Sequence, residues 1–242
     1  MDKSQIKSKE RVAERGEVFT AEREVKAMCD LVKDQCEDIY SRFLEPACGD
    51  GNFLAEILRR KLEVVKKEYK KHPDEYEVSS VIAITSIYGV DIMMDNVLAC
   101  RERMFEIWNK EYTANCKKTA NDETREVVKF ILSRNIILGN ALSMMCVDEN
   151  GEDTDEPIMF SEWTFPKGKL LFKRKDYRLD VLLKENPDEE MYDDIKLMNY
   201  SLFDDDAMCQ KYWETDPITN VIIPKPVREF APIHYRRVTE NV

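Results

Sequence analysis

Apolar residues recur every three or four positions along much of the first half of the chain, and this spacing is typical of helices. The first such stretch covers residues 22–39, and Thr20 precedes it as the expected N-cap. The same spacing predicts further helices at 52–71, 74–85, 95–116 and 122–134.

Short apolar runs separate these helices at residues 42–45, 87–90 and 135–138. Strands that alternate with helices of this length predict an α/β fold with a parallel sheet. Because the carboxyl ends of parallel strands lie at one edge of the sheet, we expect the ends of these three strands to border the functional site.

The pattern changes in the second half of the chain. Residues 148–156 are acidic and predict a loop, and residues 158–160 and 169–172 predict a β-hairpin around a Pro-Lys-Gly turn. A short helix is expected at 176–184. No internal repeat is present in the sequence.

The last part of the chain differs in composition from the rest. From Asn186 onward it is acidic and is then interrupted by several prolines. We therefore expect one domain over residues 1–185 and an extended arm over residues 186–242 that packs on the body or on a partner.

Composition limits the class of protein. The 242 residues include 37 Lys and Arg against 48 Asp and Glu, a net charge of −11, and 43% of them are hydrophobic, which is typical of a globular chain. The sequence has neither an apolar stretch long enough to span a membrane nor an N-terminal secretory signal. Its 7 cysteines show no C-x-x-C spacing, so we expect a reduced, cytoplasmic protein.

Little in the sequence supports a metal centre. The chain has only 2 histidines, His72 and His234, and we expect the first to cap a helix end and the second to be structural or exposed. No cysteine or histidine spacing matches a known metal site, so no metal is predicted.

The acidic balance also bears on nucleic-acid binding. A net charge of −11 repels a phosphate backbone, so contact with DNA or RNA needs a local basic patch or another subunit. The densest basic patch carries the interleaved aromatics Phe172 and Tyr177 and suits nucleic-acid contact, although a solvated hairpin face is an equally simple interpretation. Its cations are Lys167, Lys169, Lys173, Arg174, Lys175 and Arg178.

The segment with the most specific chemistry is Glu45-Pro46-Ala47-Cys48-Gly49-Asp50-Gly51-Asn52-Phe53-Leu54, where a strand turns into a helix. Gly49 and Gly51 allow positive φ and close approach of a ligand to the main chain. The segment is neither a G-x-x-x-x-G-K-S/T loop nor a complete G-x-G-x-x-G, because Leu54 occupies the third glycine position.

These residues resemble the S-adenosylmethionine-binding motif of N6-adenine DNA methyltransferases, and most of all the modification subunits of restriction-modification systems. Three further segments are similar to motifs of that family and occur in the family's order: 16–20, 89–92 and 139–142. The resemblance covers roughly residues 16–142. It implies a Rossmann-like class I S-adenosylmethionine-dependent methyltransferase fold, here with an N-terminal helix, a hairpin after the parallel strands and an extended C-terminal arm.

The resemblance also implies roles for individual residues. Thr20 would lie near the carboxylate of the cofactor, Asp91 would bind the ribose hydroxyls, and Asn140, where the family usually has Asp, would lie beside the adenine ring. A plain helix N-cap at Thr20 and a solvated acid at Asp91 are the simpler alternatives. The implied cofactor-binding residues are Phe19, Thr20, Glu45, Pro46, Ala47, Cys48, Gly49, Gly51, Phe53, Asp91, Ile92, Asn140 and Ala141.

The family's catalytic motif, Asn-Pro-Pro-aromatic, is missing from the chain. At the expected position we consider Trp163 as the side chain that would stack on the extruded base, and Ser161 or Glu162 as acceptors for its amino group. Packing of Trp163 in the core or the hairpin is the alternative. Asn186-Pro187 is a second, degenerate candidate for the motif.

Three functions remain open from the sequence. The first is methylation of adenine N6 in DNA in a restriction-modification, phage or mobile-element context, by direct transfer from the sulfonium sulfur. The second is a subunit that binds S-adenosylmethionine without chemistry and serves assembly or regulation. The third is a methyltransferase of RNA, protein or a small molecule, because the fold does not choose the substrate. The expected partners are DNA, directly or through another subunit, and a specificity or nuclease subunit.

Overall fold

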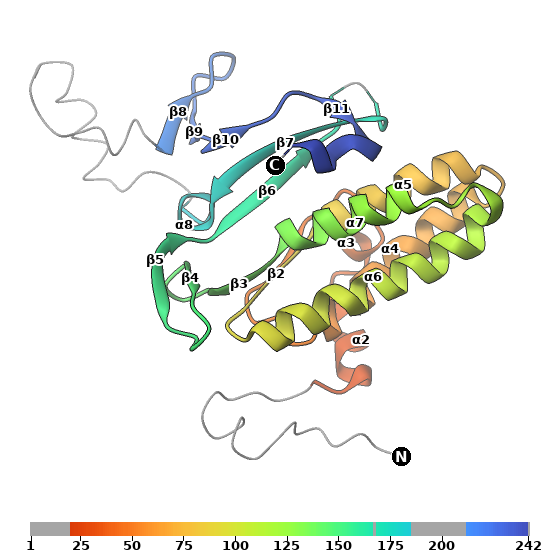
Figure 1. The fold of residues 1–242 in the computed structure, drawn as a ribbon, viewed down its shortest axis with the longest axis horizontal. Coiled ribbons are helices and arrows are strands. Elements are labelled where there is room, and N and C mark those ends of the chain that lie inside the picture. Colours follow the sequence, from red (N-terminus) through yellow and green to blue (C-terminus); the bar gives the residue numbers. More distant parts are fainter. Residues whose placement is uncertain (1–19, 167, 185–211, 242) are drawn as a thin grey trace, which may run out of the picture.

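The computed structural model describes residues 20–166, 168–184 and 212–241, and its long helices and its strands occupy different parts of the molecule (Figure 1). The α-helices are α2 (Glu22–Leu31), α3 (Lys33–Cys36), α4 (Asn52–Tyr69), α5 (Pro73–Thr85), α6 (Met94–Cys116), α7 (Asp122–Asn135) and α8 (Leu179–Leu182). The 3-10 helices are η1 (Lys117–Thr119) and η2 (Tyr235–Glu240). The strands are β1 (Phe43–Glu45), β2 (Ile87–Asp91), β3 (Ile136–Asn140), β4 (Met145–Val147), β5 (Asp153–Pro157), β6 (Met159–Thr164), β7 (Leu171–Arg178), β8 (Trp213–Thr215), β9 (Ile222–Pro224), β10 (Arg228–Glu229) and β11 (Ile233–His234).

The first sheet has the order β1-β2-β3-β4-β5 in the described residues. Its first strands run parallel, with Phe43 opposite Ile87 and Gly89 opposite Ile136. β4 and β5 continue the sheet in antiparallel pairing. The predicted α/β class is therefore confirmed and is compatible with a Rossmann-like fold, but the sheet is mixed rather than parallel throughout.

A second sheet forms around the predicted hairpin. β6 pairs with β7, and β10 and β11 add to β7 from the C-terminal part of the chain. The hairpin is longer than expected, because β7 continues to Arg178 and only α8 remains of the helix predicted at 176–184. Burial alternates along β7, with Phe172, Arg174 and Asp176 facing inward, which is a strand pattern.

The N-terminal helix differs from the expected continuous helix over 22–39. It breaks at Val32, whose φ of −123° and ψ of 39° lie outside the helical region, so α2 and α3 are separate. Leu31 is 85% exposed although its spacing suggested a core position. The N-cap of α2 is Ala21 rather than Thr20, and no side chain caps this helix.

The acidic segment 148–156 was expected to be a loop, and that expectation was wrong for its second half. β4 and β5 form a hairpin there, whose turn is closed by the Asp148 carboxylate accepting hydrogen bonds from the amides of Asn150 and Glu152. The hydroxyl of Thr154 donates to the carbonyl of Cys146 across the pair. Charged side chains are common on edge strands, and the acidic residues of β5 are the reason why its sequence predicted a loop.

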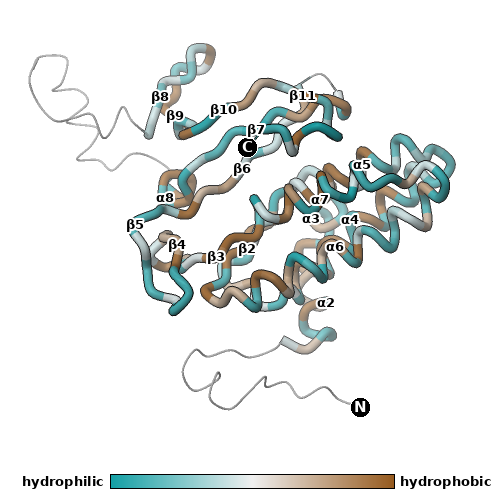
Figure 2. Tube along the Cα trace, in the orientation of Figure 1, coloured by the Kyte–Doolittle hydropathy of each residue, from teal (hydrophilic) through white to brown (hydrophobic). Residues whose placement is uncertain are grey.

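The long helices form a layer of their own against the first sheet. α5 is buried on all sides from Tyr76 to Thr85, because it lies among α4, α6 and α7. Its buried surface is mostly apolar, and the polar side chains it carries there, such as Glu77, need partners in the interior. Figure 2 shows the same distribution, with hydrophobic segments at β2 and β3 and many hydrophilic residues along the outer helices.

Two buried polar side chains fix the strands that carry the site. Lys61 of α4 is fully buried, and its Nζ donates to the carbonyls of Asp38 and Ser41 and to the hydroxyl of Ser86. Asn135 donates to the carbonyl of Ile87 at 3.1 Å. The start of β1 and the start of β2 are therefore held by specific hydrogen bonds, since a buried polar group without a partner is costly.

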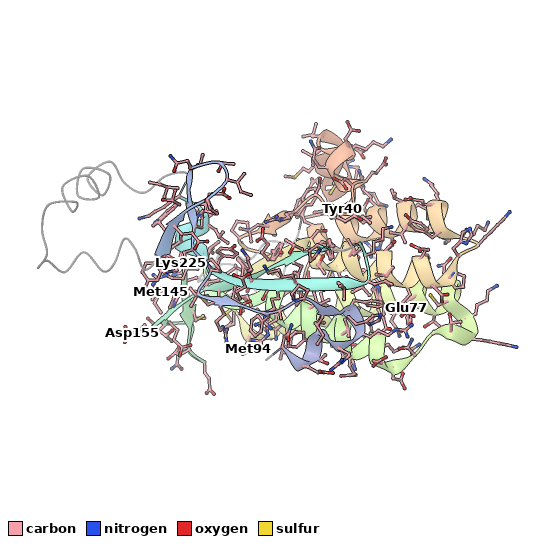
Figure 3. All side chains as sticks on the ribbon, turned by 90° about the horizontal axis from the view of Figure 1, so that it is seen from above. Tyr40, Glu77, Met94, Met145, Asp155 and Lys225 are labelled. Atoms are coloured by element: carbon pink, nitrogen blue, oxygen red, sulfur yellow. The ribbon has the colours of Figure 1, made fainter. Side chains whose placement is uncertain are left out.

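The C-terminal residues pack on the body of the protein. Tyr235 and Arg236 of η2 both donate to the carboxylate of Glu77, which is 1% exposed on α5. Figure 3 shows Glu77 at the helical end of the molecule and Asp155 of β5 at the other end. The described part of the predicted arm, residues 212–241, thus joins both the second sheet and the helical layer.

No helix within the described ranges combines the length and the apolar character that would let it cross a membrane.

Candidate cofactor site

The candidate site is the β1–α4 turn, residues 46–51, which joins the end of β1 to the start of α4. The amide of Gly51 donates to the carbonyl of Cys48 at 2.8 Å, which closes the turn. The amide of Cys48 donates to the carbonyl of Val90 at 2.9 Å, which fastens the turn to β2. The carboxyl ends of these two parallel strands therefore lie together, where open α/β sheets bind ligands.

Two glycines in the turn adopt positive φ, which L side chains rarely do. Gly49 has a φ of +53° and Gly51 a φ of +86°. A Cβ at Gly51 would lie 2.7 Å from the Sγ of Cys100, so α6 closes this side of the turn. A Cβ at Gly49 would meet no atom within 4 Å, so the main chain there faces open space that a ligand could enter.

Replacing Gly51 by alanine is expected to lower the free energy of unfolding by about 2–4 kcal/mol, because the left-handed backbone cost adds to overpacking against Cys100. Gly49→Ala is the matched control and should lose only the backbone part, about 1–2 kcal/mol. Adding Cys100→Ala to Gly51→Ala should recover part of the loss. Urea unfolding of these variants measures the differences, and equal losses at both glycines would contradict the packing role of Cys100.

Asp91, at the end of β2, connects the turn to the start of α6. Its Oδ2 accepts a hydrogen bond from the amide of Gly49 at 2.9 Å. Its Oδ1 accepts from the amide of Met93 at 2.9 Å and from Nδ2 of Asn96 at 3.1 Å. A carboxylate oxygen has two lone pairs, so Oδ2 can accept a second donor next to Gly49.

The start of α4 adds an electrostatic feature to the turn. Gly51 is the N-cap, and no side chain caps the helix. The N–H groups of a first helical turn have no partner within the helix, and this end carries the positive part of the helix dipole. Arg103 of α6 donates to Asp50 and Asn52, which holds these two side chains at the rim of the turn.

The remaining turn residues have shifted acidities. Burial raises the pKa of the Glu45 carboxyl, and a hydrogen bond from the amide of Ala47 partly opposes this. A hydrogen bond with Cys100 and burial both raise the pKa of the Cys48 thiol. Cys48 is therefore a buried neutral thiol, whereas a nucleophilic cysteine needs its thiolate form. Pro46 is exposed, and Phe53 packs against the main core.

The other residues assigned to the cofactor have mixed positions. Thr20 and Ile92 are half-buried, and Phe19 lies outside the described residues. Asn140 donates from Nδ2 to Asp153 at 3.0 Å and accepts the amide of Leu142 at 3.0 Å. These bonds join the end of β3 to β5 and occupy the amide that was expected beside an adenine ring.

The residues proposed for chemistry are not arranged as expected. Trp163 is 6% exposed in the main core, and its Nε1 donates to Asn135, so its ring has no open face for a base. The buried hydroxyl of Ser161 donates to Asp176 at 2.7 Å. Glu162 pairs with Arg42 at 2.9 Å. The alternative of core packing for Trp163 is the one observed, because β6 of the second sheet directs this side chain into the main core.

The basic patch is largely neutralised within the chain. Lys173 and Lys175 pair with Glu229 of β10, and Arg178 pairs with Asp180. Arg174 is buried, with a bidentate contact to Asp176. Lys169 donates to the hydroxyls of Tyr69 and Ser79, and Lys167 is outside the described residues. In the described residues, these contacts favour the interpretation of a structural hairpin.

A cavity of about 500 Å³ lies beside β1, and no residue of the β1–α4 turn lines it. Apolar side chains dominate its walls, and a few charged ones stand among them. It is lined by Arg42, Phe43, Leu44, Tyr88, Phe160, Ser161, Glu162, Lys175, Tyr177, Leu179, Leu182, Leu183, Ile223 and Pro224.

Sequence reasoning missed the contribution of α6 to the site. Cys100 and Arg103 contact the β1–α4 turn, and Asn96 supports Asp91. Only the helical spacing of α6 could have suggested that these positions share a face, and nothing in the sequence assigned that face to the turn.

Comparisons with protein families, with curated proteins and with solved structures found no match to this chain. Within the described residues, no group of three or more His, Cys, Asp or Glu side chains could hold a metal ion.

Proposed function

We propose that this chain is an S-adenosylmethionine-dependent methyltransferase that acts on N6 of adenine in DNA, with the cofactor held by the β1–α4 turn. The observation that supports the proposal most is the hydrogen bond that the Gly49 amide donates to the Asp91 carboxylate. It places an open stretch of main chain next to a carboxylate at the end of the neighbouring strand. The resemblance of residues 45–54 to the family's binding motif supports the same ligand.

The residues present suit a nucleoside sulfonium ligand in three respects. Open space at Gly49 lets a ligand approach the main chain, and the Asp91 Oδ2 can accept a ribose hydroxyl beside the Gly49 amide. The Asp91 carboxylate also lies at the end of β2 beside the turn, which favours a positively charged group there. Asn140 is less suited, because its amide is bonded to Asp153.

Under this proposal the bound cofactor supplies a methyl group on a positively charged sulfur. The chain's own residues bind and orient it. Asp91 would fix the ribose through its hydroxyls, the main chain of Gly49 would allow close contact, and α6 would hold the turn in shape through Cys100 and Arg103. Preorganised groups of this kind avoid the cost of ordering on binding.

A second candidate is a cofactor-binding subunit that carries out no transfer itself. It is favoured by the burial of Trp163 and by the hydrogen bond of Ser161 to Asp176, which leave neither side chain available to an extruded base. In this case the acceptor groups for the target amine belong to another chain.

Transfer of labelled methyl groups distinguishes these functions. We expect label from S-adenosylmethionine to enter DNA that contains adenine, and not the same DNA with 2-aminopurine at every adenine position, because that base lacks the N6 amine. Cofactor binding without transfer to DNA, RNA or protein would support the second candidate. Transfer to RNA or protein alone would overturn the assignment to DNA.

A further inference from the structure

The outer edge of β1 has main-chain pairing groups that find no partner among the residues that the structure describes. β1 is the first strand of its sheet, and within the described residues it pairs only with β2. The amide of Phe43 donates to the carbonyl of Ser86 on the β2 side. Because successive N–H groups of a strand point to opposite edges, the N–H and C=O of Leu44 point away from β2.

The edge is also apolar and accessible. The Leu44 side chain is 39% exposed and lines the 500 Å³ cavity. Leu44 is opposite Tyr88 in the β1–β2 register, so both side chains lie on the sheet face that looks into this cavity. Natural edge strands are usually protected by charge, proline or a covering segment. Arg42 precedes β1 and Glu45-Pro46 end it, so Leu44 is the position of β1 that offers both an outward N–H and an exposed apolar side chain.

The position of this edge matters for the candidate site. Strands of a parallel sheet normally pair with a neighbour on each side and are buried on both faces. Ligands bind at the carboxyl ends of two adjacent strands, at the point where the strand order reverses. Here the β1–α4 turn follows the edge strand of the sheet. Within the described residues, a ligand at the turn would therefore contact a strand on the β2 side and no strand on the other side.

The chemistry of the edge indicates what covers it. Free N–H and C=O groups at Leu44 match an extended main chain rather than a helix or a rigid small molecule. The adjoining cavity would take apolar side chains from that strand. A second copy of this chain is disfavoured, because each copy carries a net charge of −11, whereas a basic partner is attracted.

We propose that a partner chain of basic character adds an extended, apolar strand to the free edge of β1 and fills the cavity beside it. The strand would end next to Glu45 and Pro46, so it would also supply the missing wall of the cofactor site. In that respect the inference rests on the proposed function, although the docking itself needs no cofactor.

A short peptide of alternating valine and threonine with a lysine at each end is a suitable probe. Titrated into the full chain, it is expected to slow amide hydrogen exchange at Leu44 by at least about tenfold, a readout that a bystander apolar contact does not give. Nuclear magnetic resonance measures this residue by residue. The same peptide N-methylated on alternate residues, which removes its donors on one edge, should bind at least about tenfold more weakly.

Variants and charge provide the controls. Leu44→Pro removes the outward N–H together with the leucine side chain, and should abolish peptide binding. Thermal unfolding of this variant checks that it is folded. A peptide with glutamate at each end should bind more weakly at low salt than the lysine peptide. Equal binding of the N-methylated peptide, or no protection of Leu44 by any peptide, would overturn the proposal. Protection of Leu44 in a concentration-dependent homodimer would overturn the basic partner in favour of a second copy.

Failure of the docking proposal is distinguishable from failure of the proposed function. Protection of Leu44 by the peptide with no heat on addition of S-adenosylmethionine would leave the docking intact and remove the cofactor. Heat on addition of S-adenosylmethionine, without protection of Leu44 by the peptide, would support the cofactor and overturn the docking.

Discussion

The Glu77→Ala variant is expected to lose about 3–5 kcal/mol of unfolding free energy, because three buried hydroxyl groups would lose their acceptor at about 1–3 kcal/mol each. Glu77 is 1% exposed and accepts hydrogen bonds from three helical elements. Tyr112 of α6, Thr124 of α7 and Arg236 of η2 all donate to its carboxylate. Alanine would leave the Tyr112, Thr124 and Tyr235 hydroxyls without an acceptor in the interior. It would also remove the partner of the partly exposed Arg236 guanidinium.

Glu77→Gln is the matched control for this loss. It keeps the size and one acceptor oxygen but removes the charge, so we expect a smaller loss of about 1–3 kcal/mol. Urea unfolding at neutral pH measures both variants. A loss below about 1 kcal/mol for alanine would contradict the interpretation that Glu77 joins the C-terminal residues to the helical layer.

The contribution of Glu77 should also depend on pH. Burial acts to raise its pKa, but hydrogen bonds from Tyr235, Tyr112 and Arg236 outweigh this and hold the pKa below the ordinary value of 4.5. A folded-state pKa below the unfolded one means that the stabilisation is fully present above about pH 4.5 and is lost as the pH falls through the folded-state value. The stability difference between the wild type and Glu77→Gln should therefore shrink in acid, and a constant difference would contradict it.

The second large effect is expected on ligand binding at Asp91. Asp91→Ala should weaken S-adenosylmethionine binding by at least about a hundredfold, because it removes the acceptor that positions the Gly49 amide and the acceptor expected for the ribose. The amide of Met93 and the side chain of Asn96 lose their acceptor too, so the start of α6 should loosen. Isothermal titration calorimetry measures the change in Kd.

Two control variants make this prediction specific. Asp91→Asn keeps one acceptor oxygen and should weaken binding by about tenfold, since a hydrogen bond to a charged group is stronger than one to a neutral group. Asp122→Ala removes an equal charge at the start of α7, beyond the far end of α6 from the site, and should leave Kd unchanged. A loss at Asp122 as large as that at Asp91 would show a general charge effect and contradict the proposed contact.

Local patterns were sufficient to predict the elements around the candidate site. The helical spacing located α4, α6 and α7, and the apolar runs located β1, β2 and β3, because these segments each bury one face or lie wholly inside. The glycines at 49 and 51 predicted a turn with positive φ, which is observed. These features depend on neighbours within a few residues.

Features that depend on distant contacts were not predictable. The charged residues of β5 hid a strand, since its pairing with β4 is set by the fold and not by its own composition. The break at Val32 leaves Leu31 in solvent, contrary to its spacing. Trp163 was predicted to stack on a base, but it lies in the core and donates a hydrogen bond to Asn135, 28 residues away in the sequence.

The buried charged residues illustrate the same limit. Lys61 and Glu77 belong to residue types that usually lie at the surface, yet both are buried here. They hold β1 and η2 in place through partners far along the chain. Sequence periodicity identifies the face of a helix but gives no partner for a charge on it.

Isothermal titration of S-adenosylmethionine into the purified, folded chain tests the central claim most directly. The account predicts a saturable heat with one site per chain and a Kd on the order of 1–100 μM, lost in Asp91→Ala and retained in Asp122→Ala. The absence of heat, together with no rise in melting temperature at millimolar ligand, would contradict it.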